Sequence, residues 1–253
     1  MTVPLRRRES RGSARVLLLH GLGCTNSMWD RFADQLGDSV ELWDVRLPWH
    51  GLDGGWGHVA DQAAAVVDAV ENGPGFDAVI AHSFAAGLLL EAFAADRIAP
   101  RPAVLASVFY RAEPTDFTWT DISRYLNEFH LIFAEALRLG GGGAEQRLER
   151  ACRIRDQIGP YGWVRFFESY LRTPFLDLSG IRAPQLVLAG DSDIATRQSD
   201  SRALAELLPS GGFGVLGDCG HFPMLEQPGA FARAVLDFLT ASVLPTSPAL
   251  ELT

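Results

Sequence analysis

Short apolar runs alternate with longer segments of helical spacing along most of this chain, and this alternation restricts the fold more than any other feature. Apolar strands separated by helices are typical of a parallel sheet covered on both faces. We therefore predict an α/β fold with a mostly parallel central sheet and helices on both faces. The predicted strands are 16–19, 40–45, 78–81, 103–109, 185–189 and 213–216, and the predicted helices are 27–36, 59–70, 84–95, 197–208 and 230–239.

The alternation stops between residues 111 and 175, where helices at 121–139, 145–158 and 163–171 are predicted instead. Four glycines at 140–143 interrupt this region and are expected to form a flexible joint. We interpret 111–175 as an all-helical lid inserted into an α/β core formed by 1–110 and 176–241. Residues 3–8 are a candidate further strand, and 242–253 are expected to form a flexible tail.

The charged residues exclude several classes of protein. All 22 basic residues are arginine, and 31 acidic residues give a net charge of −9. The lack of lysine excludes enzymes that work through a lysine Schiff base. An acidic chain with scattered arginines is poorly suited to nucleic acid, so no such partner is expected. The length of 253 residues suits one α/β domain with an insertion.

Cysteine usage and hydropathy bear on the compartment. Cys24, Cys152 and Cys219 show no paired spacing, so we expect free thiols in a reducing compartment. No apolar run approaches the ~20 residues that span a bilayer, and no membrane partner is expected. Three arginines at 6–8 and the apolar run at 16–19 imitate an export signal, but that run is too short and is broken by His20. The expected location is the cytoplasm.

The strongest local motif is Ala81-His82-Ser83-Phe84-Ala85, which follows a predicted strand and opens a predicted helix. A nucleophile elbow needs a serine on a tight strand-to-helix turn with small residues two positions before and after it. Ala81 and Ala85 satisfy that requirement with one methyl group more than the usual glycines. The alternative is that Ser83 is an ordinary helix N-cap.

Three further motifs each follow a predicted strand. His20-Gly21-Leu22-Gly23 is a loop that could offer the Leu22 N–H to an oxyanion, together with the Phe84 N–H, or could be a plain glycine turn. Gly190-Asp191-Ser192-Asp193 places carboxylates at the end of a strand, although the same residues favour a turn. His221 lies in the glycine-rich loop 217–223, where a histidine could also be merely exposed.

Taken together, these motifs resemble those of the α/β-hydrolase family, in the order oxyanion loop, serine, aspartate, histidine, over about residues 16–239. The loop 44–51, with Trp49 in place of a glycine, and the Glu226-Gln227-Pro228 stretch are similar to that family too. The resemblance implies that Ser83 attacks an acyl carbonyl, His221 takes its proton and Asp193 orients the imidazole. The alternative candidates for the acid are Asp191, Glu113 and Asp116.

Aromatic residues are concentrated in the predicted lid, with eleven of the 25 Phe, Trp and Tyr residues between 111 and 175. We expect most to pack on the sheet and some to face an apolar acyl or aromatic small molecule. The pocket candidates are His20, Gly21, Cys24, Trp119, Phe129, Trp163, Phe167 and Phe222.

The expected activity is hydrolysis of an ester, thioester or lactone, without an organic cofactor. Six histidines without ligand spacing predict no metal site. The same fold also supports acyltransferases, cyclases, lyases, cofactor-free oxygenases and receptor-like binding proteins, so these stay open. The sequence leaves the oligomeric state open as well.

Overall fold

The computed structural model describes residues 3–8, 11–49 and 54–244, and within them seven strands form one sheet. The strand order is β1-β3-β2-β4-β5-β6-β7, with β1 antiparallel to β3 and every other pair parallel. This confirms the predicted mostly parallel sheet. The strands are β1 (Leu5–Arg7), β2 (Arg15–Leu19), β3 (Glu41–Val45), β4 (Ala78–His82), β5 (Ala103–Ala106), β6 (Gln185–Gly190) and β7 (Gly211–Leu216).

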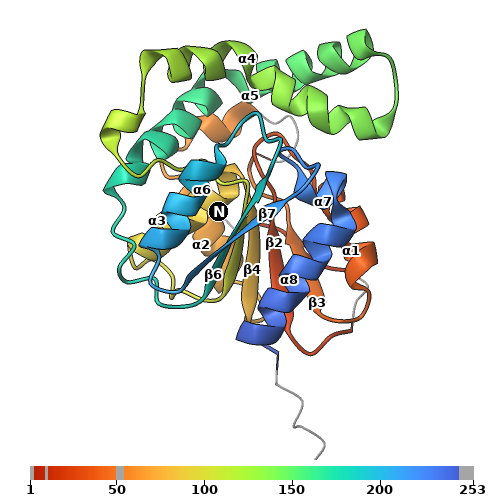
Figure 1. The fold of residues 1–253 in the computed structure, drawn as a ribbon, viewed down its shortest axis with the longest axis vertical. Helices are drawn as coiled ribbons and strands as arrows, with labels where there is room; N and C mark the ends of the chain where they lie inside the picture. The colour runs from red at the N-terminus through yellow and green to blue at the C-terminus, as the bar shows by residue number, and fades with distance from the viewer. Residues whose placement is uncertain (1–2, 9–10, 50–53, 245–253) are drawn as a thin grey trace, which may run out of the picture.

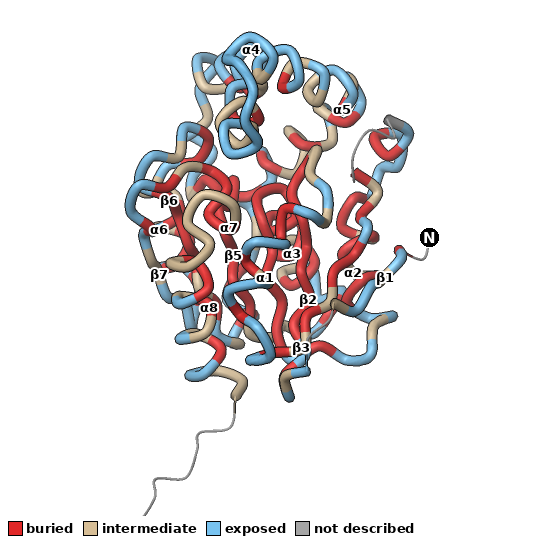
Figure 2. The backbone as a smooth tube through the Cα atoms, turned by 90° about the vertical axis from the view of Figure 1, so that its right-hand side faces the viewer, coloured by how far each residue is buried: buried red, intermediate tan, exposed pale blue. Residues whose placement is uncertain are grey.

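Helices cover the sheet on both sides (Figure 1). α1 packs against α8 and α2 packs against α3. Every residue of β4 and β5 is buried, and α3 is buried over most of its length, as expected for a helix that is apolar all round (Figure 2). The covering helices are α1 (Asp30–Leu36), α2 (Ala63–Glu71), α3 (Phe84–Ala94), α6 (Gln198–Leu207), α7 (Pro223–Glu226) and α8 (Pro228–Ser242).

Two long helices, α4 (Trp119–Leu137) and α5 (Ala144–Arg172), are inserted between β5 and β6 and lie together above one end of the sheet (Figure 1). We call residues 119–172 the helical insertion. A Cβ built on Gly23, in the loop after β2, would lie 2.9 Å from the Ile154 side chain and 3.2 Å from that of Phe133. The helical insertion therefore packs on the carboxyl end of the sheet.

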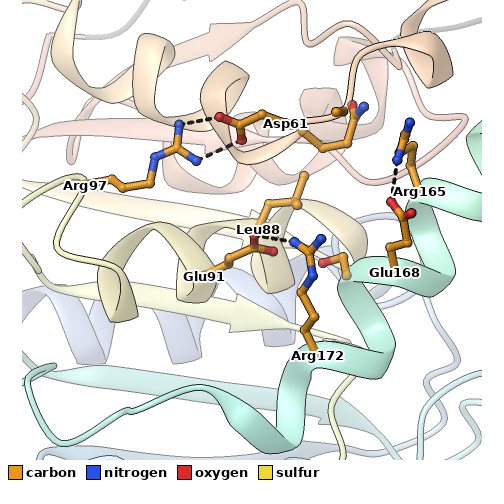
Figure 3. Close-up of a pocket in the computed structure, with 10 residues that line it drawn as sticks. Asp61, Leu88, Glu91, Arg97, Arg165, Glu168 and Arg172 are labelled. Carbon is orange, nitrogen blue, oxygen red and sulfur yellow. Dashed lines mark hydrogen bonds and ion pairs between the residues drawn. The ribbon is translucent and has the colours of Figure 1, made fainter.

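A cleft of about 310 Å³ lies beside the helical insertion and contains several ion pairs (Figure 3). Arg172 of α5 binds Glu91 of α3 at 3.1 Å. Arg97 donates two hydrogen bonds of 2.8 Å to Asp61, and these bonds lower the pKa of that carboxyl. The Arg172–Glu91 pair therefore joins the C-terminal part of α5 to the core.

The order of the strands explains where loops can meet. β2 pairs with β3 on one side and with β4 on the other, so the chain changes direction across the sheet between these strands. Parallel sheets form crevices at the carboxyl ends of the strands beside such a point. Leu19 is in register with Ala81, which makes the loops after β2 and β4 direct neighbours.

Several predicted boundaries differ from the structure. β5 ends at Ala106 rather than 109, because Ser107 adopts a φ of 50° that a strand does not accommodate. After the 3₁₀ helix η2 (Gly54–His58), α2 begins at Ala63 rather than 59, because the Asp61 side chain accepts the Ala64 N–H at 3.0 Å and caps the helix there. His50 and Gly51 of the loop 44–51, and 245–253 of the predicted tail, lie outside the described residues.

Candidate active site

Ser83 occupies the sharp turn between β4 and α3. Its φ of 55° and ψ of −121° are rare for a residue with a side chain and place Ser83 outside both the strand and the helix. Ala81 and Ala85 are both fully buried, as the close packing of such a turn requires. The Ser83 side chain makes no cap bond to α3, so the simple N-cap interpretation does not hold. Ser83 is 5% exposed.

A continuous chain of hydrogen bonds joins three of the predicted site residues. Nε2 of His221 lies 3.0 Å from Oγ of Ser83, and Nδ1 of His221 lies 2.9 Å from Oδ2 of Asp193. The three residues come from the loops after β4, β6 and β7. An ionised Asp193 only accepts, so Nδ1 carries the proton and Nε2 accepts from the serine hydroxyl.

The Asp193 carboxylate is held by the turn that contains it. Oδ1 accepts the Ala195 N–H at 2.7 Å and the Thr196 N–H at 3.2 Å, and Oδ2 accepts the Thr196 hydroxyl at 2.5 Å. Burial alone would raise the pKa of Asp193, but the neighbouring His221 ring and these hydrogen bonds lower it. These contacts therefore favour the ionised form of Asp193.

The other candidate acids occupy different positions. Asp191 accepts the backbone N–H groups of Asp218 and Cys219, both at 3.0 Å, and these bonds lower the pKa of Asp191. Asp191 thus fixes the loop that carries His221. Asp116 accepts the Glu113 N–H at 3.1 Å in an exposed turn, so the structure places both of these residues in a local cap.

Glu226 supports the His221 loop from its other side. One of its carboxylate oxygens accepts the Gly220 N–H at 2.8 Å, and the other accepts the Phe222 N–H at 2.9 Å. The two residues flanking His221 are therefore bonded to one side chain. The sequence stretch 226–228 points to the family, but it does not reveal this role.

His82 is a buried neighbour of the site that sequence reasoning missed. Its Nε2–H donates to the His221 carbonyl at 2.9 Å. Burial, with a smaller contribution from the nearby His221, lowers the pKa of His82 to about 3, so this ring stays neutral. A Cβ on Gly21 would lie 2.6 Å from Nδ1 of His82, which explains the glycine there.

The predicted oxyanion loop lies beside the serine. Leu22 and Phe84 are both buried, and Phe84 is the first residue of α3, where backbone N–H groups have no partner within the helix. His20 places Nδ1 3.0 Å from the Gly21 carbonyl, so its ring supports the loop. The Cys24 thiol donates to the Leu22 carbonyl at 3.5 Å, and burial raises its pKa to about 12. Cys24 is therefore a protonated thiol.

Aromatic rings pack around His221. The Phe222 ring centroid is 5.2 Å from that of His221, and the Phe109 centroid is 5.5 Å away. Phe129 of α4 stacks on Phe109 at 5.8 Å, and Trp163 of α5 packs on Phe129 at 4.5 Å. Sequence reasoning missed Phe109, although its position shortly after a parallel strand is the signal that could have identified it.

Two of the predicted pocket residues lie farther from the base. Phe167 packs on Phe166, with centroids 5.2 Å apart, and Phe166 in turn contacts Phe109. Trp119 is 85% exposed in the first turn of α4, so the structure does not bring it to this cluster. The prediction that Trp119 lines the pocket is therefore wrong, because its ring is exposed to solvent.

Comparison with known proteins supports the architecture. The sequence model of the alpha/beta hydrolase family matches residues 16–234. The chain belongs to the alpha/beta hydrolase family. This result and the sheet confirm the predicted family and fold class. Among curated proteins, no sequence matches that of this hydrolase-family member.

Several solved structures share its fold. A thermophilic esterase from Thermogutta terrifontis is 21% identical with a TM-score of 0.61, and the match covers 94% of this chain and 93% of that one. MenH from S. aureus is 16% identical with a TM-score of 0.66, covering 95% and 99%. The enol-lactonase from Burkholderia xenovorans LB400 is 19% identical with a TM-score of 0.58, covering 94% and 97%. Identities this low establish a common fold alone.

The described residues contain neither a membrane-spanning helix nor a cluster of metal-binding side chains. Over 3–8, 11–49 and 54–244, no helix has both the length and the apolar character to cross a bilayer. Over the same ranges, His, Cys, Asp and Glu side chains form no group of three or more that could hold a metal ion.

Proposed function

We propose that this protein is a serine hydrolase that cleaves an ester, thioester or lactone. The observation that carries the proposal is the hydrogen-bonded chain from Asp193 through His221 to Ser83, with the serine on a positive-φ turn. Such a chain activates a hydroxyl that is a weak nucleophile at its ordinary pKa. Family membership supports a hydrolase in general, and the geometry supports this particular mechanism.

The proposed reaction proceeds in two halves. Oγ of Ser83 attacks the acyl carbon while Nε2 of His221 takes the hydroxyl proton, and the Asp193 carboxylate stabilises the imidazolium. The backbone N–H groups of Leu22 and Phe84 donate hydrogen bonds to the carbonyl oxygen as negative charge develops on it. His221 returns its proton to the departing alkoxide or thiolate, leaving an acyl group on Ser83. A water molecule then attacks this acyl group by the same steps, and Ser83 regains its proton.

We propose a small-to-medium, largely apolar acyl or aromatic substrate. The rings that surround His221 support this choice, because an apolar wall favours an apolar guest. In this proposal, residues 111–175 form the lid, and neither a metal nor an organic cofactor takes part. The three free cysteines are consistent with the cytoplasm as the site of action.

A second candidate is acyl transfer to an alcohol or amine, and one observation favours it. Ser83 and His221 are 5% and 3% exposed, so the helical insertion and the surrounding rings restrict access of water to an acyl group on Ser83. Addition of alcohol or amine acceptors during turnover of an activated ester distinguishes the two, because a transferase forms the new ester or amide in preference to the free acid.

The test is covalent labelling of the serine. A fluorophosphonate should add one adduct, which peptide mapping should place at Ser83, and Ser83→Ala should neither label nor retain more than about a thousandth of the esterase activity. His221→Ala should label much more slowly. Ser107→Ala is the matched control, since Ser107 is also buried at the end of a neighbouring strand with positive φ. Half the activity surviving in Ser83→Ala would refute the proposal.

A further inference from the structure

The backbone of Ala195 connects α4 to the Asp193 carboxylate. The N–H of Ala195 donates to Oδ1 of Asp193 at 2.7 Å, and its carbonyl accepts the hydroxyl of Tyr125 at 2.8 Å. Tyr125 lies in the helical insertion, 70 residues earlier in the chain. The side chain of Tyr125 therefore bonds to the same peptide segment that bonds to the Asp193 carboxylate.

The residues packed around Tyr125 direct its hydroxyl toward the Ala195 carbonyl. Tyr125 is buried, and a buried tyrosine hydroxyl usually requires a partner. Its ring packs on Phe109 and Phe129, with centroids 5.8 and 6.4 Å away. Tyr170 of α5 hydrogen-bonds to Tyr125, and burial together with this bond raises the pKa of Tyr170. Tyr125 thus has a well-packed ring and a hydroxyl directed at the Ala195 carbonyl.

Two ion pairs lie close to the Tyr125 contact. Arg197, which precedes α6, binds Asp121 in the first turn of α4 at 2.6 Å. Arg111, which is 1% exposed and precedes the helical insertion, binds Asp200 of α6 at 2.5 Å. The turn that contains Asp193 leads directly into α6, so the helical insertion holds this turn through Tyr125 at Ala195 and through Asp121 at Arg197.

We infer that Tyr125 is a positioning residue for Asp193, acting through Ala195, and that the helical insertion thereby completes the active site. This inference rests on the proposed function. Without the Tyr125 hydroxyl, the Ala195 carbonyl loses its buried partner and the 193–197 turn relaxes. The Asp193 carboxylate then no longer holds the His221 imidazole in its productive orientation, although the substrate still meets the same aromatic rings.

Tyr125→Phe tests this, because it removes one oxygen atom and leaves the ring. We expect kcat for an activated ester to fall roughly tenfold with KM nearly unchanged, since the lost hydrogen bond acts on the base and not on the substrate. Tyr161→Phe is the matched control: Tyr161 is another tyrosine of the helical insertion, in α5, but is 59% exposed. Thermal unfolding of each variant sets a temperature at which all of them are folded.

A double-mutant cycle separates positioning from a general structural effect. If Tyr125 acts through Asp193, then Tyr125→Phe should cost little further activity in an Asp193→Asn background. A purely structural role would cost the same factor in both backgrounds. The downfield proton NMR signal of the His221 Nδ1–H, shared with Asp193, should shift in Tyr125→Phe and stay in place in Tyr161→Phe.

The outcomes are distinguishable. A Tyr125→Phe variant with kcat within twofold of the parent and an unmoved Nδ1–H signal overturns the inference, and so does a tenfold loss that is additive with Asp193→Asn. Both of these results leave the proposed function standing as long as activity still depends on Ser83. Activity that survives Ser83→Ala refutes the proposed function itself, whatever Tyr125→Phe does.

Discussion

Asp191 and Asp193 lie in one turn, yet their carboxylates bind different partners. Oδ2 of Asp193 contacts Nδ1 of His221, whereas Asp191 accepts two backbone N–H groups of the loop that carries His221. In the proposed mechanism the first interaction involves the ring that takes the proton, whereas the second fixes the path of the backbone. The two residues should therefore differ sharply in their effect on rate.

We predict that Asp193→Asn lowers kcat far more than Asp191→Asn. An amide cannot stabilise the imidazolium or hold the productive tautomer, and a loss of roughly 10⁴-fold accompanies the same change in another Ser-His-Asp triad. Asp191→Asn keeps one acceptor oxygen, so a loss below about tenfold is expected. Steady-state kinetics on a single ester decides the ranking. The reverse order would assign the acid to Asp191, and no loss in either variant would point to Glu113 or Asp116.

The rate should depend on pH through one group. A histidine base acts only when neutral, so kcat/KM should rise as the pH increases and then level off. Asp193 has a lowered pKa and His82 has a pKa of about 3, so neither titrates between pH 5 and 9. The measurement is a pH–rate profile with chemistry shown to be rate-limiting. A profile that is flat from pH 5 to 9 would contradict the assignment of His221 as base.

The sequence predicted which residues form the hydrogen-bonded chain, because Ser83, Asp193 and His221 each belong to a local motif that follows a strand. Tyr125 could not be assigned in this way. Its helical spacing indicates an apolar stripe on α4, but only the packed structure shows that its hydroxyl meets the Ala195 carbonyl. The exposed position of Trp119 could not be predicted either, because composition does not tell which rings of a helix face the core.

Among the elements, α5 contains a sharp change of direction. Gly159 adopts a φ of 70°, Pro160 follows, and the Trp163 indole donates across the kink to the Arg155 carbonyl at 3.2 Å. A residue before proline disfavours helical angles, and the positive φ favours glycine. The kink therefore agrees with the two separate helices predicted at 145–158 and 163–171.

Gly159→Ala should lower stability through backbone strain alone. A Cβ at Gly159 meets nothing within 4 Å, so the cost is that of left-handed backbone, about 1 kcal/mol. Gly180→Ala is the matched control, because its Cβ also has open space and its φ is not positive. Urea unfolding should show a lower midpoint for Gly159→Ala only. Equal midpoints for the two variants would show that the kink tolerates a side chain.

The remaining differences between predicted and observed elements have local causes. The Asp61 side chain caps α2 at its start, and the positive φ of Ser107 ends β5 early. Apolar runs and helical spacing indicate the type of an element well. They contain little information about the backbone angles at its ends, which packing against neighbouring loops decides.

At the scale of the whole molecule, the sheet brings together residues that are far apart in the chain, such as Ser83 and His221, whose numbers differ by 138. The alternation of strands and helices was enough to predict a parallel sheet, and parallel strands place all their carboxyl ends at one edge. The position of the helical insertion on that edge could not be predicted, because it depends on contacts such as those of Ile154 and Phe133 with the loop at Gly23.

Phe129 of α4 packs on Phe109, which is a neighbour of His221. One helical turn earlier in α4, Tyr125 bonds to the 193–197 turn, which contains Asp193. A change that tilts α4 to admit a bulkier guest also moves the Tyr125 hydroxyl. If Tyr125 positions Asp193 as we propose, substrate range and turnover are not independent traits in this chain. In directed evolution toward larger esters, we expect early variants along α4 to gain breadth while losing speed, with recovery arising from second substitutions around residues 193–197.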